Sequence, residues 1–151
     1  MNVIIANEAK SMLSTLDIDV IKSVDGVHTA DEIVEMFKNF FYARMILDIT
    51  AIKDYNDIIN IQKISIGLDA DKIILLLPNN EASTSSSYLS KIISMGIYNF
   101  TTTVDGVKYF LDHPNTYKDV AHIQQLNDLS TTINEKVVAG SRIIGIKNVT
   151  D

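Results

Sequence analysis

Three polar side chains stand where two apolar segments end, and they are the first candidates for chemistry in this sequence. Asp48 lies near the end of the apolar run 43–50. Asn7 and Glu8 directly follow the apolar run 2–6. Short apolar runs rich in branched residues predict buried strands, and open α/β sheets bind their ligands beyond the carboxyl ends of such strands. Asp48 is therefore placed to act as a reactive carboxylate, while its simpler interpretation is a carboxylate that caps a neighbouring helix or faces solvent.

Other reactive constellations are weak. The chain has no cysteine, which removes disulfides, thiolate metal sites and cysteine nucleophiles. Its histidines, His28, His113 and His122, lie far apart in the sequence, so we expect no zinc site. The sequence has neither a Gly-x-Ser-x-Gly elbow nor a Gly-x-x-x-x-Gly-Lys-Ser/Thr loop, so we expect neither a serine hydrolase nor ATP binding. A flavodoxin-like enzyme or cofactor binder remains a third possibility, although residues 7–11 and 79–87 lack the glycines of a phosphate-binding loop.

Hydrophobic patterning predicts five strand–helix repeats within residues 1–114. Strands are expected where apolar or branched residues are concentrated, at 2–6, 19–24, 43–50, 72–78 and 97–101. Helices are expected where apolar residues recur at helical spacing, at 8–16, 29–41, 55–67, 88–95 and 104–111. The alternation implies a parallel sheet with helices on both faces and right-handed crossovers. We therefore predict an α/β, flavodoxin-like three-layer sandwich with a five-stranded parallel sheet in the order 2-1-3-4-5.

Polar segments interrupt and follow these repeats. Thr29-Ala-Asp-Glu32 predicts a capping box at the start of the second helix. Residues 79–87 are small and polar and predict a loop that is long enough to move, with an ordinary solvated turn as the simpler interpretation. After Pro114, residues 115–139 are expected to form a linker that is partly helical. Residues 140–151 predict either the first strand of a second domain or an ordered tail on the first.

The bulk composition excludes several classes of protein. With 151 residues, of which 46% are hydrophobic, the chain is long enough for one globular domain with a real core. Its net charge of −6 and the lack of a Lys/Arg cluster disfavour nucleic-acid binding. We expect no signal peptide and no membrane span, because residues 1–6 lack a basic segment and no apolar run approaches ~20 residues. Together with the absence of cysteine, this predicts a cytoplasmic protein.

The order and spacing of these features resemble the receiver domain of response regulators, which accepts a phosphoryl group in two-component signalling and phosphorelays. Ile46-Leu-Asp-Ile49 is similar to the apolar run around the phospho-accepting aspartate of receivers. Gly96-Ile-Tyr-Asn-Phe100 resembles the start of their fifth strand. The resemblance extends from residue 1 to about residue 113 and implies that Asp48 corresponds to the phospho-acceptor.

The sequence departs from the receiver pattern at most of the other functional positions. Receivers hold Mg²⁺ with two acidic residues after the first strand, and Asn7 and Glu8 stand at those places here. The Thr or Ser that contacts the phosphoryl group in receivers corresponds to Pro78 or Asn79. The receiver lysine after the fifth strand falls within residues 101–103, which contain only threonine. The resemblance thus implies a weakened Mg²⁺ site and poor stabilisation of phosphoryl charge.

We therefore expect a degenerate receiver, or pseudo-receiver: a non-enzymatic regulatory or localisation module that acts by protein–protein contacts and needs no cofactor. Phosphoryl transfer to a carboxylate depends on positioning and charge neutralisation, and the groups that supply both are incomplete here. The alternative is an active phospho-accepting receiver of a signalling system. In that case Asp48 is the acceptor, and Mg²⁺ is bound by Asn7, Glu8 and Asp48.

The resemblance also implies a partner for this module. In receivers, the face made by the fourth helix, the fifth strand and the fifth helix is the usual surface for partners or for homodimers. On this chain that face corresponds to Tyr88, Lys91, Tyr98 and Lys108. Residues 140–150 resemble the first strand of a MinD/ParA-like P-loop ATPase, and atypical receivers precede such ATPases in CpaE-like proteins. This implies that the module controls or targets a fused ATPase.

Overall fold

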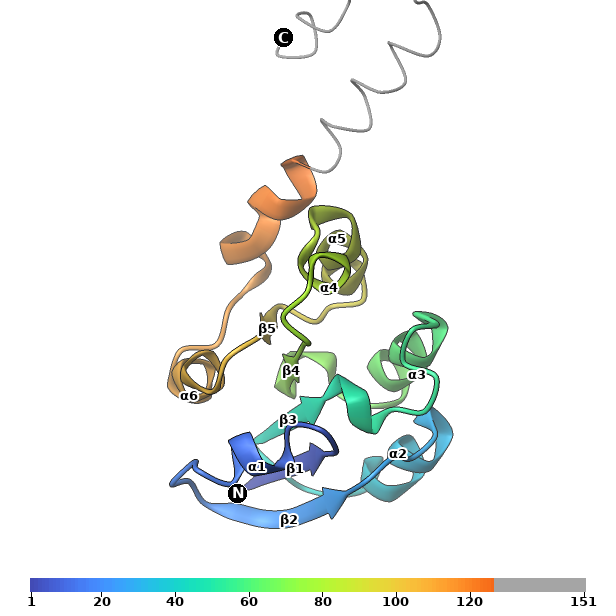
Figure 1. Ribbon diagram of the computed structural model, residues 1–151, viewed down its shortest axis with the longest axis vertical. Helices are drawn as coiled ribbons and strands as arrows, with labels where there is room; N and C mark the ends of the chain where they lie inside the picture. The colour runs from blue at the N-terminus through green and yellow to red at the C-terminus, as the bar shows by residue number, and fades with distance from the viewer. Residues whose placement is uncertain (127–151) are drawn as a thin grey trace, which may run out of the picture.

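A computed structural model describes residues 1–126, which fold as an α/β sandwich around a five-stranded parallel sheet (Figure 1). The strand order is β2-β1-β3-β4-β5, which confirms the predicted fold class and topology. The strands are β1 (Asn2–Ala6), β2 (Val20–Asp25), β3 (Arg44–Asp48), β4 (Ile73–Leu76) and β5 (Asn99–Thr101). The expected strand or tail at 140–151 and most of the expected linker lie outside the described residues.

Helices cover both faces of the sheet. The α-helices are α1 (Lys10–Leu13), α2 (Ala30–Phe37), α3 (Ile59–Gly67), α4 (Glu81–Thr84), α5 (Ser86–Ser94) and α6 (Val104–Asp112). Two short 3-10 helices are η1 (Ile49–Ala51) and η2 (Ala70–Lys72), and a further helix occupies residues 117–126. Within residues 1–126, no helix is both long and apolar enough to cross a membrane.

The core consists of two apolar clusters on opposite faces of the sheet. The larger cluster contains buried side chains from α2, α3 and α5, and the smaller cluster contains Leu13 of α1 and Val107 of α6. Alternate residues of β3 enter different clusters, with Met45 in the larger and Ile46 in the smaller. Because the central strands are buried on both faces, their sequences are continuous apolar runs without polar alternation.

The second helix ends earlier than its apolar pattern predicts. We predicted a helix over 29–41, but α2 ends at Phe37. Tyr42 is buried and packs its ring edge-on against Phe37, so the chain must leave the helix before β3 begins. Phe41 is consequently 78% exposed, and the Lys72 ammonium lies 5.8 Å from its ring centroid.

The polar stretch 79–87 is largely helical and was wrongly predicted as a loop. It contains α4 and the start of α5. The side chain of Asn80 accepts a hydrogen bond from the Ser83 N–H at 2.8 Å, and that of Ser85 accepts one from the Tyr88 N–H at 3.2 Å. Small polar residues favour both loops and helix N-termini, and here they act as helix caps.

The predicted capping box is present at the start of α2. Thr29 Oγ1 accepts a hydrogen bond from the Glu32 N–H at 3.1 Å, and the Glu32 carboxylate accepts one from the Thr29 N–H at 2.8 Å. The hydrogen bond from the Thr29 backbone holds the pKa of Glu32 below its usual value. Its stabilising contribution is therefore present at neutral pH and is lost as the pH falls through this lowered pKa.

We expect Thr29→Ala to lower the free energy of unfolding by about 1 kcal/mol, because the first turn loses the hydroxyl that accepts from the Glu32 N–H and aligns the capping box. Urea denaturation measures this change. Thr29→Ser is the matched control, since it keeps the hydroxyl and should retain most of the stability. Equal loss in both variants would contradict a capping role for the hydroxyl.

Candidate functional site

The carboxyl edge of the sheet brings Asp48 next to the loop that follows β1. β1 and β3 are neighbouring parallel strands, and Ile5 pairs with Leu47 in their register. The loop of residues 7–9 and the end of β3 therefore emerge side by side. As predicted, the polar residues after the first and third strands meet at one edge.

The Asp48 carboxylate is buried, with 2% of its surface exposed, and is fully hydrogen-bonded. Its Oδ2 accepts hydrogen bonds from the backbone N–H groups of Asn7 and Ala9, both at 2.9 Å. Its Oδ1 accepts from the Thr50 N–H at 3.0 Å and from the Thr50 hydroxyl at 2.8 Å. Each carboxylate oxygen offers about two lone-pair sites, so these four donors occupy the acceptor capacity of the group.

Thr50 extends this network to the rest of the loop. Its Oγ1 accepts a hydrogen bond from the Glu8 N–H at 3.1 Å, and its carbonyl oxygen accepts one from the Asn7 carboxamide at 3.0 Å. Asp48 and Thr50 therefore bind the backbone N–H groups of residues 7, 8 and 9 in succession. We call Asp48, Thr50 and residues 7–9 the carboxylate clamp.

No family model matches this chain, and none of the curated proteins or solved structures does. The chemistry of the carboxyl edge is therefore inferred from its own contacts.

A carboxylate that attacks phosphorus needs a free lone pair, and Asp48 would have to break a charge-assisted hydrogen bond to supply one. The clamp is thus arranged to hold a loop, which corresponds to the capping interpretation of Asp48.

The three residues of the weak Mg²⁺ candidate do not direct oxygen atoms to one point. The Asn7 carboxamide points its nitrogen to the Thr50 carbonyl, the Glu8 side chain is exposed, and Asp48 is bound by N–H and O–H donors. Among residues 1–126, no three His, Asp or Glu side chains are grouped so that they could hold a metal ion. Mg²⁺ requires near-octahedral oxygen ligands, and the carboxylate oxygens of Asp48 are already occupied by N–H and O–H donors.

A cavity of about 210 Å³ opens beside the clamp at the carboxyl edge. It is lined by Glu8, Ala9, Met12, Asp48, Thr50, Leu76, Leu77, Pro78, Asn79 and Thr102. Within the described part of the chain, these lining residues include two acids and no Lys, Arg or His. The nearest basic residue along the chain, Lys10, forms an ion pair with Asp25 at 2.8 Å. A phosphoryl group in this cavity would meet two carboxylates and no compensating cation.

The four residues of the predicted partner face lie in different surroundings. Tyr88 is half-buried, and burial raises the pKa of its hydroxyl, with Tyr55 adding to the shift. Lys91 is exposed on the side of α5 that faces α3, and Lys108 is exposed on α6. Tyr98 precedes β5, and its ring packs on that of Tyr117 with the centroids 5.9 Å apart.

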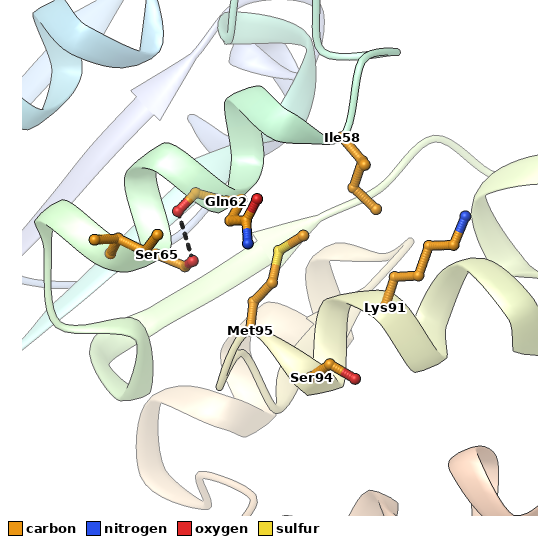
Figure 2. Close-up of a pocket in the computed structure, with 7 residues that line it drawn as sticks. Ile58, Gln62, Ser65, Lys91, Ser94 and Met95 are labelled. Carbon is orange, nitrogen blue, oxygen red and sulfur yellow. Dashed lines mark hydrogen bonds between the residues drawn. The ribbon is translucent and has the colours of Figure 1, made fainter.

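A surface groove separates α3 from α5 (Figure 2). Its volume is about 400 Å³, and its lining residues are Ile58, Gln62, Ser65, Ile66, Lys91, Ser94 and Met95. The flexible side chain of Met95 lies between the two helices, and Lys91 extends away from it (Figure 2). Ile66 on the rim is 78% exposed, so part of the groove wall is apolar and accessible to a partner.

Sequence reasoning missed Thr50, which binds both Asp48 and the loop of residues 7–9. A local signal for it exists, because an aspartate followed two residues later by threonine favours side-chain hydrogen bonds to the backbone. The donors of residues 7 and 9 carry no such signal, since they belong to the main chain.

We expect Asp48→Asn to lower the free energy of unfolding by about 3 kcal/mol, because a carboxamide at this position cannot accept all four hydrogen bonds and buried donors lose their partner. Urea denaturation gives the value. Asp17→Asn, at an exposed carboxylate, is the control and should change stability by less than about 0.5 kcal/mol. An Asp48→Asn protein as stable as the control would mean that the clamp does not support the fold.

Proposed function

We propose that this chain is a receiver-like regulatory module that acts through protein contacts and does not depend on phosphorylation. The observation that carries the proposal is the saturation of Asp48 by four donors from its own chain. A switch needs a group whose modification biases a second conformation. Here the corresponding carboxylate, Asp48, has its acceptor positions occupied by hydrogen bonds, whereas a phosphoryl acceptor needs a free lone pair.

The charge around Asp48 supports the same proposal. Transfer of a phosphoryl group is catalysed mainly by positioning and by cations that neutralise its oxygens. Among residues 1–126, the lining of the adjacent cavity offers Glu8, Asn79 and Thr102 but no cation. The geometry favours a fixed loop over a reactive centre.

The output of such a module has to come from its surface. The groove between α3 and α5 and the region around Tyr98 are candidate contact surfaces for a protein partner or for a second copy of the chain. We further propose that the module is cytoplasmic and that residues 140–150, which lie outside the described part, lead into a MinD/ParA-like ATPase. The module would then control or target that ATPase.

Titration with Mg²⁺ and beryllofluoride, a phosphoryl analogue, tests the proposal. We expect no saturable change in the amide chemical shifts of Glu8, Asp48 and residues 79–87, because the acceptor is occupied and no cation among the described residues lines the cavity beside it. Incubation with acetyl phosphate followed by mass spectrometry should likewise show no phosphorylated protein.

Saturable shifts centred on Asp48, or a phosphoryl group mapped to it, would overturn the proposal in favour of an active receiver. Glu8→Gln and Asp17→Asn are the matched variants for that outcome. Glu8→Gln should weaken a genuine Mg²⁺-dependent response, and Asp17→Asn should leave it unchanged.

A further inference from the structure

The helix at residues 117–126 lies alongside α5 and is joined to it through one carboxamide (Figure 1). Gln124 Nε2 donates hydrogen bonds to the Ser90 carbonyl at 3.1 Å and to Ser94 Oγ at 2.9 Å. Gln124 Oε1 accepts a hydrogen bond from the Tyr117 hydroxyl at 2.7 Å. The helix thus covers a side of α5 that adjoins the groove with α3, because Ser94 borders both.

A second attachment lies at β5, just before the helix begins. The Asn115 N–H donates to Asn99 Oδ1 at 2.6 Å, and the Asn115 carboxamide donates to the Tyr98 carbonyl at 3.0 Å. The ring of Tyr98 is covered edge-on by Tyr117. This attachment thus combines two hydrogen bonds with one aromatic contact.

Among residues 117–126, Val120 is the one fully buried side chain, with 4% of its surface exposed, and it belongs to neither core cluster of the described residues. Ile123 is partly buried, and Tyr117 and Leu126 are largely exposed. The helix start is held locally, because Asp119 accepts hydrogen bonds from the Thr116 N–H at 2.8 Å and from the Thr116 hydroxyl at 3.2 Å. Segments with few buried apolar contacts and many exposed hydrogen bonds open at lower free energy than the core.

We propose that helix 117–126 is a reversible cover over the α5–β5 surface, which we define as Ser90, Ser94, Tyr98 and Asn99. This inference rests on the proposed function, since it specifies how contact with a protein partner is regulated. With the helix bound, the surface is hidden, and with the helix released, it is free. The partner would supply a helix that repeats the aromatic, valine and glutamine positions of residues 117, 120 and 124.

Backbone hydrogen exchange of the full chain tests whether the cover opens independently. Protection of the amides in 117–126 should be at least about tenfold lower than that of β3 and β4, and it should depend less steeply on urea. Val120→Asp should abolish that protection while leaving β3 and β4 protected. Gln125→Asp introduces the same charge at an exposed position of the same helix and should leave the protection unchanged.

A synthetic peptide with the sequence of residues 115–126 tests whether the surface can be filled from outside. It should shift the amide signals of Ser94 and Tyr98 in Val120→Asp protein but not in wild type, where the surface is covered. The same peptide carrying Gln124→Ala should bind at least about tenfold more weakly, because the carboxamide makes both bonds to α5.

Two results would overturn the proposal that helix 117–126 is a reversible cover. The first is exchange of 117–126 only through global unfolding, or loss of the whole fold in Val120→Asp, since either makes the helix part of the core. The second is failure of the peptide to bind the released surface. Neither result depends on Asp48, so the two proposals can fail separately. If helix 117–126 opens independently and the protein also responds to beryllofluoride, the cover is retained and the proposed function is rejected.

Discussion

The described structure depends on one buried carboxylate whose four hydrogen bonds join two loops of the sheet. Asp48 lies at the end of a strand that is buried on both faces, where an unpaired charge would be costly. The loop after β1 supplies two of its donors, and the turn after β3 supplies the other two. The short helix α1 starts directly after this loop, and its N-cap residue Ala9 donates its N–H to Asp48, so the clamp also holds the start of α1.

The arrangement around α5 shows how the fold divides its surface. On one flank lies the groove toward α3, with Met95 and the exposed Ile66. On the other flank lies helix 117–126, attached through Gln124. A single helix thus separates an open apolar surface from one that is covered by polar contacts. The two surfaces meet at Ser94, which lines the groove and also accepts a hydrogen bond from Gln124.

The sequence was sufficient for the strand order and for the position of Asp48, because both follow from apolar runs and from where they end. It was insufficient for the role of Asp48, because two of the donors are main-chain groups that no side-chain pattern encodes. The end of α2 was missed because it depends on the burial of Tyr42, a tertiary effect. The docking of helix 117–126 on α5 was missed because it uses hydrogen bonds from the polar side chain of Gln124, and a pattern of apolar residues contains no information about such bonds.

The use of main-chain donors in the clamp has a consequence for how such sequences evolve. Any residue other than proline can supply the N–H groups of positions 7, 8 and 9, so these three hydrogen bonds place no demand on the side chains there. The carboxamide of Asn7 adds a separate bond to the Thr50 carbonyl. The aspartate and the threonine two residues later have no such freedom, because their side chains are the acceptors. An aspartate at this position can therefore be kept for its role in the fold alone. Its presence in a related sequence is accordingly no marker of signalling by phosphorylation.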